Sequence, residues 1–381
     1  MATAPGASLL GPIPFKPQKS CVRQLEVEGA ALQREAAPTP FADVEVDSGL
    51  VSGVPVQLAE ENADADLVSA LPSAPRPNNG LPNLRFYEGF WLPEWPVPAA
   101  VALQRRFEPR RDDVIVASFP KCGTTWVNAL TFATMARRAY PSVGAGHPLL
   151  RLNPHQCIPF LEGLFVSRRG EAKLEALPSP RVMNTHMPLA MIPRAAAPGG
   201  GGCKVAYVCR QPKDMVVSRW HFHRRLHPEL AFADVFGAVC SGVVAYGPAK
   251  TLWDHMLGYW SDSTARPDSM LFLRYEELLR DPAEHVRALA RFVGLPFSGA
   301  EEDAGAVHDI VKLYSSGRLK NLEANKTGHV NPILQIPRGA LFRKGAASDW
   351  ALSNHTTSEM AQHLDEIIAN KLHASGLTFH E

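Results

Sequence analysis

The sequence predicts an α/β fold of a single domain, with a central parallel β-sheet flanked by helices on both faces. Three apolar runs have the length and composition of buried strands, namely Val114–Ala117, Lys204–Cys209 and Met270–Tyr275. Helical patterns follow these runs, and chains in which strands alternate with helices form parallel sheets. We therefore expect residues 81–381 to form one α/β domain.

The first predicted strand leads into a turn with the composition of an anion-binding loop. The turn is Phe119-Pro120-Lys121-Cys122-Gly123-Thr124-Thr125, and a helical pattern follows at Trp126, Val127, Leu130 and Ala133. Backbone N–H groups, the positive end of the helix dipole, hydroxyl groups and an ammonium group would meet there, which suits a phosphate-like anion. This predicts a P-loop-like strand–loop–helix unit. The alternative is an ordinary turn with an exposed Lys and a buried Trp.

A histidine stands at the end of a further short strand. Residues 181–187 are typical of a strand that stops at Pro188. His186 lies near the carboxyl end of this strand, and in open α/β sheets this is the edge where ligands bind. A structural role for His186 is the alternative, because histidine side chains fill many roles in proteins.

The strand Lys204–Cys209 is followed directly by an arginine. Pro212 is well placed to open a helix, and Arg210 and Ser218 could then reach one phosphate group. An ion pair between Arg210 and Asp214 is the alternative. The glycine run at residues 199–202 precedes the strand, whereas dinucleotide folds place their glycines after it, so the order argues against a nicotinamide site.

The remaining carboxyl-terminal patterns complete the domain. Asp281 at N-cap, Pro282 and Glu284 predict a helix start, and Gly294 predicts its end. A final amphipathic helix is indicated by Met360, Leu364, Ile367, Ile368 and Leu372. Between these helices, Phe342-Arg343-Lys344-Gly345 places two cations beside a glycine.

Composition limits the partners of the chain. Its 39 basic and 38 acidic residues give a net charge of +1, so no overall field favours nucleic acid or an anionic membrane. No apolar run reaches the ~18 residues of a membrane helix. The six cysteines have no zinc-ligand spacing, which indicates no metal and predicts reduced thiols in a cytoplasmic protein.

The first 80 residues differ from the rest. They are rich in Ala and Pro, with 10 acidic against 5 basic residues and few aromatics, and we expect a largely disordered acidic tail over residues 1–80. The aromatic cluster Arg85–Trp91 marks the start of the domain. It suits either core packing or the wall of an apolar pocket.

These motifs together resemble the cytosolic (soluble) sulfotransferases that use 3′-phosphoadenosine 5′-phosphosulfate (PAPS), and most of all the plant members. The resemblance covers about residues 85–375. It is carried by four ordered motifs, Phe119–Trp126, Thr185–Pro188, Tyr207–Ser218 and Arg343–Trp350.

The resemblance implies a role for each motif. His186 would be the general base for a hydroxyl of a small, mostly apolar acceptor such as a flavonoid, steroid or hormone-like compound. Lys121 would stabilise the oxygen that leaves the sulfuryl group, with no metal required. The cofactor site would comprise Lys121, Cys122, Gly123, Thr124, Thr125, Trp126, Arg210, Ser218, Tyr275, Ser315, Arg343, Lys344 and Gly345. Acceptor specificity would depend on loop side chains such as Phe90, Trp91, Phe160 and Phe165.

The chain also departs from the family pattern. Many members have Ser or Thr in place of Cys122, and many animal members have Lys in place of Asn184. Ser316 stands where a Phe usually stacks on adenine, and Ser348 replaces a glycine. The family's dimerisation motif, Lys-x-x-x-Thr-Val, is not evident, so the oligomeric state stays open.

Two other functions remain compatible with the sequence. A non-catalytic nucleotide-binding member of the same fold would keep the site and lack turnover. A P-loop nucleotide kinase would need G-x-x-x-x-G-K-[ST], which is absent, and here Lys121 precedes Gly123. Product assays with and without the sulfonate donor separate these functions.

Overall fold

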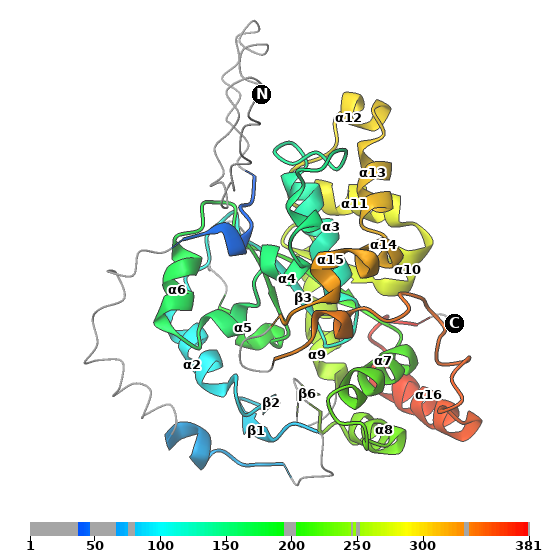
Figure 1. The fold of residues 1–381 in the computed structure, drawn as a ribbon. Helices are drawn as coiled ribbons and strands as arrows, with labels where there is room; N and C mark the ends of the chain where they lie inside the picture. Colours follow the sequence, from blue (N-terminus) through cyan, green and yellow to red (C-terminus); the bar gives the residue numbers. More distant parts are fainter. Residues whose placement is uncertain are drawn as a thin grey trace, which may run out of the picture.

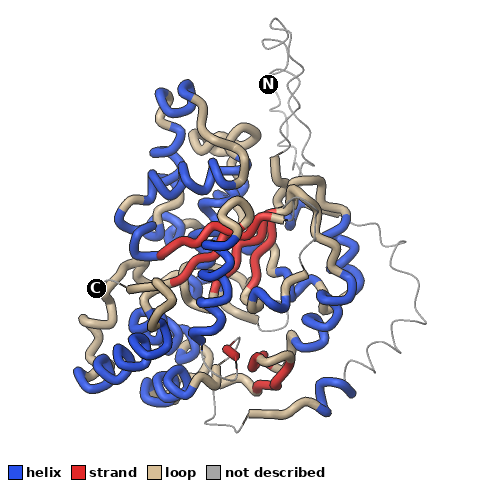
Figure 2. The backbone as a smooth tube through the Cα atoms, turned by 180° about the vertical axis from the view of Figure 1, so that it is seen from behind, coloured by secondary structure: helices blue, strands red, loops and turns tan. Residues whose placement is uncertain are grey.

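The computed structural model describes residues 37–45, 66–74, 81–193, 203–244, 247–248, 252–330 and 335–379. Their centre is a four-stranded parallel sheet in the order β4-β3-β5-β7. The strands are β3 Val114–Ser118, β4 Val182–Thr185, β5 Lys204–Cys209 and β7 Met270–Arg274. Figure 2 shows these strands side by side with helices around them, which confirms the predicted parallel sheet.

The alternation of side chains along β3 builds a core on each face of the sheet. All five residues of β3 are buried. Ile115 and Ala117 contribute to one apolar core, and Val114 and Val116 contribute to the other. The predicted cover of helices on both faces is therefore confirmed.

Different helices supply the two cores (Figure 1). The core of Val114 and Val116 is covered by α3 Thr124–Ala136, α11 Pro282–Phe292 and α13 Ala306–Leu313. The core of Ile115 and Ala117 is covered by α2 Val97–Arg106, α5 Leu161–Leu164, α7 Pro212–Arg224, α8 Phe232–Ser241, α9 Leu252–Ala265 and α16 Ser358–Leu372. The shorter helices are α4 Pro154–Cys157, α6 Arg168–Glu175, α10 Tyr275–Arg280, α12 Gly299–Asp303, α14 Ser316–Asn321 and α15 Glu323–Lys326.

Local signals placed the ends of these helices well. The Asp281 carboxylate accepts a hydrogen bond from the Glu284 backbone N–H at 3.0 Å, Pro282 opens α11, and Gly294 has a φ of +82° just beyond its end. The final helix α16 contains the predicted apolar positions. The glycine run at residues 199–202 lies outside the described residues.

The aromatic cluster forms a hairpin that the sequence did not reveal. Strands β1 Leu84–Tyr87 and β2 Phe90–Pro93 are antiparallel, and β2 also pairs with β6 Gly247–Pro248. The turn consists of Glu88 and Gly89, with φ of +47° and +89°. Glutamate is an unusual residue at a positive φ, which explains why the usual hairpin signal was missing.

The described part of the amino-terminal region contacts the domain at two places. Residues Phe41–Asp43 form a short 3-10 helix, and Asp43 forms an ion pair with Arg151. Further along, the Ala74 N–H donates to the Leu84 carbonyl at 3.1 Å. The remainder of the predicted tail lies outside the described residues, and its disorder stays a prediction.

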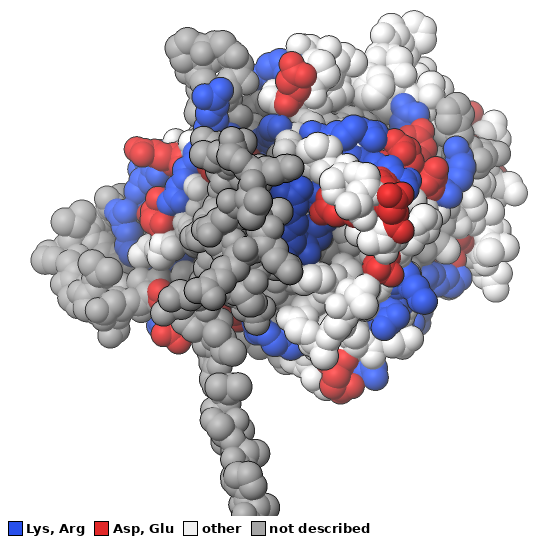
Figure 3. Space-filling view, turned by 90° about the horizontal axis from the view of Figure 1, so that it is seen from above, with Lys and Arg blue, Asp and Glu red and all other residues white. Residues whose placement is uncertain are grey.

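The described helices and surface agree with the balanced composition. Among the residues with a described structure, no helix combines the length and hydropathy of a membrane span. On the face drawn in Figure 3, Lys and Arg side chains stand among Asp and Glu side chains.

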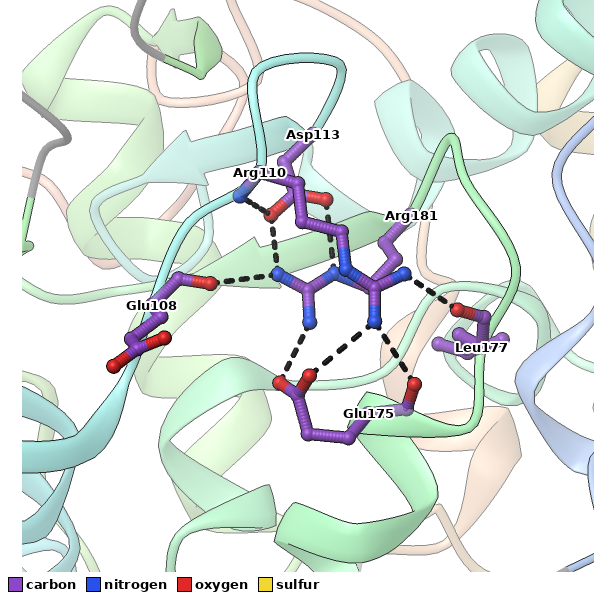
Figure 4. Close-up of polar contacts among 6 residues, drawn as sticks. All are labelled: Glu108, Arg110, Asp113, Glu175, Leu177 and Arg181. Carbon is purple, nitrogen blue, oxygen red and sulfur yellow. Dashed lines mark hydrogen bonds and ion pairs between the residues drawn. The ribbon is translucent and has the colours of Figure 1, made fainter. Parts of the chain in front are cut away.

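A buried ion-pair network joins the amino-terminal ends of β3 and β4 (Figure 4). Asp113 precedes β3 and Arg181 precedes β4, and both side chains are completely buried. The Arg181 guanidinium donates to Asp113 at 2.6 and 2.9 Å and to Glu175 at 2.8 Å. Arg110 donates to the Leu177 carbonyl at 2.7 Å. The network fixes the strands at the edge opposite to their carboxyl ends.

Candidate functional site

A cavity of about 950 Å³ opens at the carboxyl edge of the sheet. Parallel pairing brings the ends of the strands together, since Ala117 is opposite both Thr185 and Tyr207, and Cys209 is opposite Arg274. The cavity is lined by twelve of the predicted residues: Lys121, Gly123, Thr124, Thr125, Trp126, His186, Arg210, Ser218, Tyr275, Arg343, Lys344 and Gly345.

The predicted anion-binding turn has the conformation that its glycine permits. Gly123 has a φ of +106°, and Lys121 has a φ of +73°. A Cβ atom at Gly123 would lie 2.5 Å from a ring carbon of Tyr275, so no other residue fits there without a shift of that ring. The helix α3 then begins at Thr124, with its amino terminus facing the cavity.

Two predicted cofactor residues do not line the cavity. Cys122 is buried in the apolar core, where burial raises the pKa of its thiol to about 12 and keeps it neutral. Only the backbone of Cys122 is therefore suited to bind an anion. Ser315 is exposed and precedes α14, while its neighbour Ser316 lines the cavity instead.

Lys121 is surrounded by other cations. Its ammonium nitrogen lies 4.1 Å from the ring centre of Phe222 on α7. Burial, followed by the charges of Arg210 and Arg225, lowers the pKa of Lys121 to about 7. An anion in the cavity would reverse this effect, because it favours the charged form of the ammonium group.

The position of Arg210 is compatible with both roles that the sequence suggested, namely phosphate binding and an ion pair with Asp214. It lines the cavity, and its guanidinium also lies 3.4 Å from the Asp214 carboxylate. The pair is buried, with 7% of the Arg210 side chain and none of Asp214 exposed, so it is no surface ion pair. Arg210 also donates to the Ala346 carbonyl at 2.9 Å. This hydrogen bond connects Arg210 to the carboxyl-terminal loop that carries Arg343 and Lys344.

The carboxyl-terminal loop is fastened to α7. The Trp350 N–H donates to Asp214 at 2.9 Å, and the Lys213 ammonium nitrogen lies 3.9 Å from the centre of a Trp350 ring. Asp349 accepts hydrogen bonds from Arg343 and Lys344. These contacts bring the predicted cofactor residues Arg210 and Arg343 together, although they are more than a hundred positions apart in the sequence.

Ser316 and Ser348, the two serines that depart from the family pattern, have different consequences for this loop. Ser348 has a φ of +56°, so it adopts the left-handed conformation that the family's glycine would allow. Ser316 packs against Gly345, where a Cβ atom would lie 2.1 Å from the Ser316 hydroxyl oxygen. Ser348 therefore has a φ that is rare for residues other than glycine, and the Ser316 hydroxyl occupies the space beside Gly345.

Two aromatic rings of the predicted cofactor site lie against each other. The rings of Trp126 and Tyr275 meet edge to face, with centres 5.8 Å apart and planes at 80°. The Trp126 indole N–H donates to the Tyr314 carbonyl at 2.9 Å, which fixes the orientation of its ring. Tyr275 begins α10 directly after β7, at the same edge of the sheet.

His186 is held in one tautomer. Its Nδ1 atom lies 2.8 Å from the Ser118 carbonyl oxygen, and a carbonyl can only accept, so Nδ1 carries the proton. Nε2 is then the basic nitrogen. Burial lowers the pKa of His186 to about 3, so the ring is neutral at physiological pH.

Two buried residues that sequence reasoning missed hold the backbone of His186. The Glu162 carboxylate accepts from the His186 N–H at 2.8 Å, and burial raises the pKa of Glu162 to about 7. The His255 ring donates from Nε2 to the His186 carbonyl at 3.1 Å, and the Tyr207 hydroxyl donates to His255 Nδ1 at 3.1 Å. No local pattern links these positions, which lie on different elements.

His155 is a further site residue to which the sequence analysis gave no role. Its Nε2 atom lies 3.1 Å from the Thr125 hydroxyl oxygen in the anion-binding turn. Burial, followed by the charge of Lys121, lowers the pKa of His155 to about 4. Other lining residues that the sequence did not single out are Arg219, Phe222, His223, Arg225 and Lys320.

The part of the cavity around Phe160 is lined mainly by apolar side chains. The ring centre of Phe160 lies 5.1 Å from that of His186. Of the four rings suggested for acceptor specificity, only Phe160 lines the cavity, whereas Phe90, Trp91 and Phe165 do not. The apolar wall includes Phe41, Trp95, Pro159, Leu164, Ile336 and Leu341.

The cavity is equipped for an anionic nucleotide. The Nε atoms of Arg210 and Arg343 are buried and have no hydrogen-bond partner among the described residues. A phosphate oxygen is the acceptor that such a guanidinium suits. The residues described here include no cluster of three or more potential metal ligands. Fold and site together define an α/β protein with an anion-binding turn beside a neutral histidine.

Comparisons with known proteins specify this class. A family model described as Sulfotransferase domain matches residues 111–376. Cytosolic sulfotransferase 11 of Arabidopsis thaliana is 37% identical over 334 residues, or 86% of this chain and 92% of the relative. Flavonol 4′-sulfotransferase of Flaveria chlorifolia is 37% identical over 295 residues, or 76% of this chain and 88% of the relative.

A solved structure gives the same result. The crystal structure of a mouse sulfotransferase complexed with PAP is 25% identical, with a TM-score of 0.59 over 77% of this chain and 95% of that chain. The chain therefore belongs to the sulfotransferase family and is a PAPS-dependent sulfotransferase of the plant cytosolic type.

Proposed function

We propose that this protein transfers the sulfuryl group of PAPS to a hydroxyl of a small, mostly apolar metabolite in the cytoplasm. The observation that carries the proposal is the position of His186 and Lys121 in one cavity, at the ends of the neighbouring strands β4 and β3. A base and an acid on the two sides of one reacting group are what an in-line transfer requires.

His186 and Lys121 have different roles in the proposed reaction. Nε2 of His186 accepts the proton of the acceptor hydroxyl as its oxygen forms a bond to sulfur. The sulfur–oxygen bond to the phosphate breaks, and the electron pair remains on the phosphate oxygen. The ammonium group of Lys121 stabilises this oxygen. When bound, PAPS supplies the sulfuryl group, and the products are the sulfate ester and 3′-phosphoadenosine 5′-phosphate (PAP).

The remaining cofactor residues are proposed to bind by charge and stacking. Arg210, Ser218, Arg343, Lys344 and Gly345 would hold the 3′-phosphate. The Nε atoms of Arg210 and Arg343, which have no hydrogen-bond partner in the described part of the chain, support this assignment. Trp126 and Tyr275 would contact adenine, and the turn from Lys121 to Thr125 would hold the 5′ end.

The class of acceptor is proposed from the apolar wall. Phe160 beside His186, together with Phe41 and Trp95, offers rings to an apolar molecule such as a flavonoid, steroid or hormone-like compound. A relative named flavonol 4′-sulfotransferase supports this range.

The test has a binding step and a product step. PAP binding is measured by calorimetry for the intact protein and for Arg210→Ala, and we expect micromolar binding that the variant loses. A panel of hydroxylated acceptors is then assayed for sulfate esters, with His186→Ala as the inactive reference. PAP binding without any product would favour a non-catalytic nucleotide-binding protein. Phosphate transfer from ATP would favour a kinase.

A further inference from the structure

The cavity contains positive charge beyond the proposed cofactor site. The described residues that line it include no Asp or Glu but nine Lys and Arg side chains. These nine are Lys121, Arg169, Lys173, Arg210, Arg219, Arg225, Lys320, Arg343 and Lys344. Arg169 and Lys173 lie on α6, next to the apolar wall, and belong to no motif that binds the nucleotide. They therefore need a separate explanation.

Helix α6 is fixed relative to the reacting histidine. The apolar wall runs from Phe160, beside His186, along α5 to Leu164 and then to Gly170 on α6. A Cβ atom at Gly170 would lie 2.3 Å from the Leu164 carbonyl oxygen, so α6 packs closely on the end of α5. One continuous wall thus connects His186 with Arg169 and Lys173.

The charges of α6 are separated between its two faces. Glu171 pairs with Arg106 at 2.7 Å, and Glu175 pairs with Arg181 at 2.8 Å, both away from the cavity. Arg169 and Lys173 are four positions apart and share the face that lines the cavity. Neither forms an ion pair within the part of the chain that the structure describes. The carboxylates of α6 therefore pair with Arg106 and Arg181 and not with Arg169 or Lys173.

Lys173 is held in an apolar setting. Its ammonium nitrogen lies 4.5 Å from the ring centre of Phe41, which also lines the cavity. The nearby carboxylate of Asp43 accepts from Arg151. Burial, followed by the charge of Arg169, lowers the pKa of Lys173. A half-buried cation that has no carboxylate partner among the described residues differs from the solvated charges of an ordinary helix surface.

We propose that Arg169 and Lys173 bind a carboxylate at the end of the acceptor opposite to the hydroxyl that is sulfated. The proposal rests on the proposed function, since it concerns the acceptor of the same cavity. It narrows the acceptor to a hydroxylated acid with an apolar body, which fits a wall that is apolar beside His186 and basic at α6. Phe41 would pack on the molecule next to the carboxylate.

The probes are ω-hydroxyalkanoic acids of increasing chain length and their methyl esters, which carry a methyl group in place of the negative charge. We measure kcat/KM for each acid and ester, and binding of each to the enzyme with PAP by calorimetry. We expect the acid to exceed the ester about tenfold or more at the best chain length, the ratio for one charge-assisted hydrogen bond. Each of Arg169→Gln and Lys173→Gln should reduce this ratio.

Arg168→Gln is the matched control, because Arg168 is on the same helix, pairs with Glu171 and does not line the cavity. It should keep the acid-to-ester ratio of the unchanged protein. Equal binding of acids and esters at every chain length would overturn the proposal, as would an equal effect of Arg168→Gln. The proposal would also be overturned if kcat/KM were higher for the esters than for the acids and Arg169→Gln left this preference unchanged.

The binding measurement separates the two proposals. If esters are sulfated and acids bind no better, the carboxylate site is wrong and the sulfotransferase function stands. If acids bind more tightly through Arg169 and Lys173 but no compound is sulfated, the carboxylate site stands and the proposed reaction is wrong.

Discussion

The Nδ1 atom of His186 lies 2.8 Å from the carbonyl oxygen of Ser118, at the ends of two adjacent parallel strands. The pairing of β3 with β4 thus sets the tautomer of the ring, because a strand carbonyl supplies the acceptor. Catalytic chemistry at this site depends on the register of the sheet as well as on the identity of the residue.

Replacement of His186 by alanine should reduce kcat about 10²–10⁴-fold, the usual contribution of a general base. PAP affinity should change little, since the cofactor residues stay in place. The two effects are read from product formation and calorimetry on one preparation. Turnover close to that of the unchanged protein would show that another group accepts the proton.

PAP binding should take up a proton near pH 8. In the empty cavity the pKa of Lys121 is about 7, against a usual value of 10.5. Bound phosphate favours the charged ammonium and raises this pKa, so affinity should fall as the pH rises above 7. Calorimetry in two buffers with different ionisation enthalpies measures the proton. Lys121→Met should abolish the uptake, and equal heats in both buffers for the intact protein would contradict this prediction.

Gly123→Ala should weaken PAP binding at least tenfold and destabilise the fold by about 1–3 kcal/mol. The added Cβ meets the ring of Tyr275 at 2.5 Å and requires a φ of +106°. Gly237→Ala is the control, because Gly237 lies within α8 and a Cβ there meets no atom within 4 Å. Equal PAP affinity for both variants would show that the turn does not depend on its glycine.

Arg181→Met should lower the free energy of unfolding by about 3–5 kcal/mol, because it leaves the Asp113 carboxylate buried without its partner. Urea unfolding measures this loss. Arg291→Met is the control, since the exposed pair of Arg291 with Glu284 should contribute less than about 1 kcal/mol. Similar losses for both variants would contradict a structural role for the buried network. PAP affinity of folded Arg181→Met should be nearly unchanged.

Activity should persist in the presence of a chelator. The cations of Lys121, Arg210 and Arg343 line the cavity, so they can stabilise the charge that develops in the proposed reaction without a metal ion. Sulfate ester formation before and after treatment with EDTA measures this. Loss of activity that Mg²⁺ restores would refute the proposed mechanism.

The sequence by itself determined the features that short segments encode. Buried strands were evident at Val114–Ala117 and Lys204–Cys209 because a strand buried on both faces is continuously apolar. The start of α11 was evident because Asp281 satisfies a free N–H within its own turn. The anion-binding turn was also local, since strand, glycine and helix start are contiguous.

Only the tertiary structure decided which distant residues support the site. Glu162 and His255 hold the backbone of His186, and Arg169 and Lys173 line the same cavity, yet no periodicity or spacing relates these residues to His186. The tertiary structure also directed Cys122 into the core. Burial and long-range hydrogen bonds arise from the packing of elements far apart in the chain, so local patterns do not reveal them.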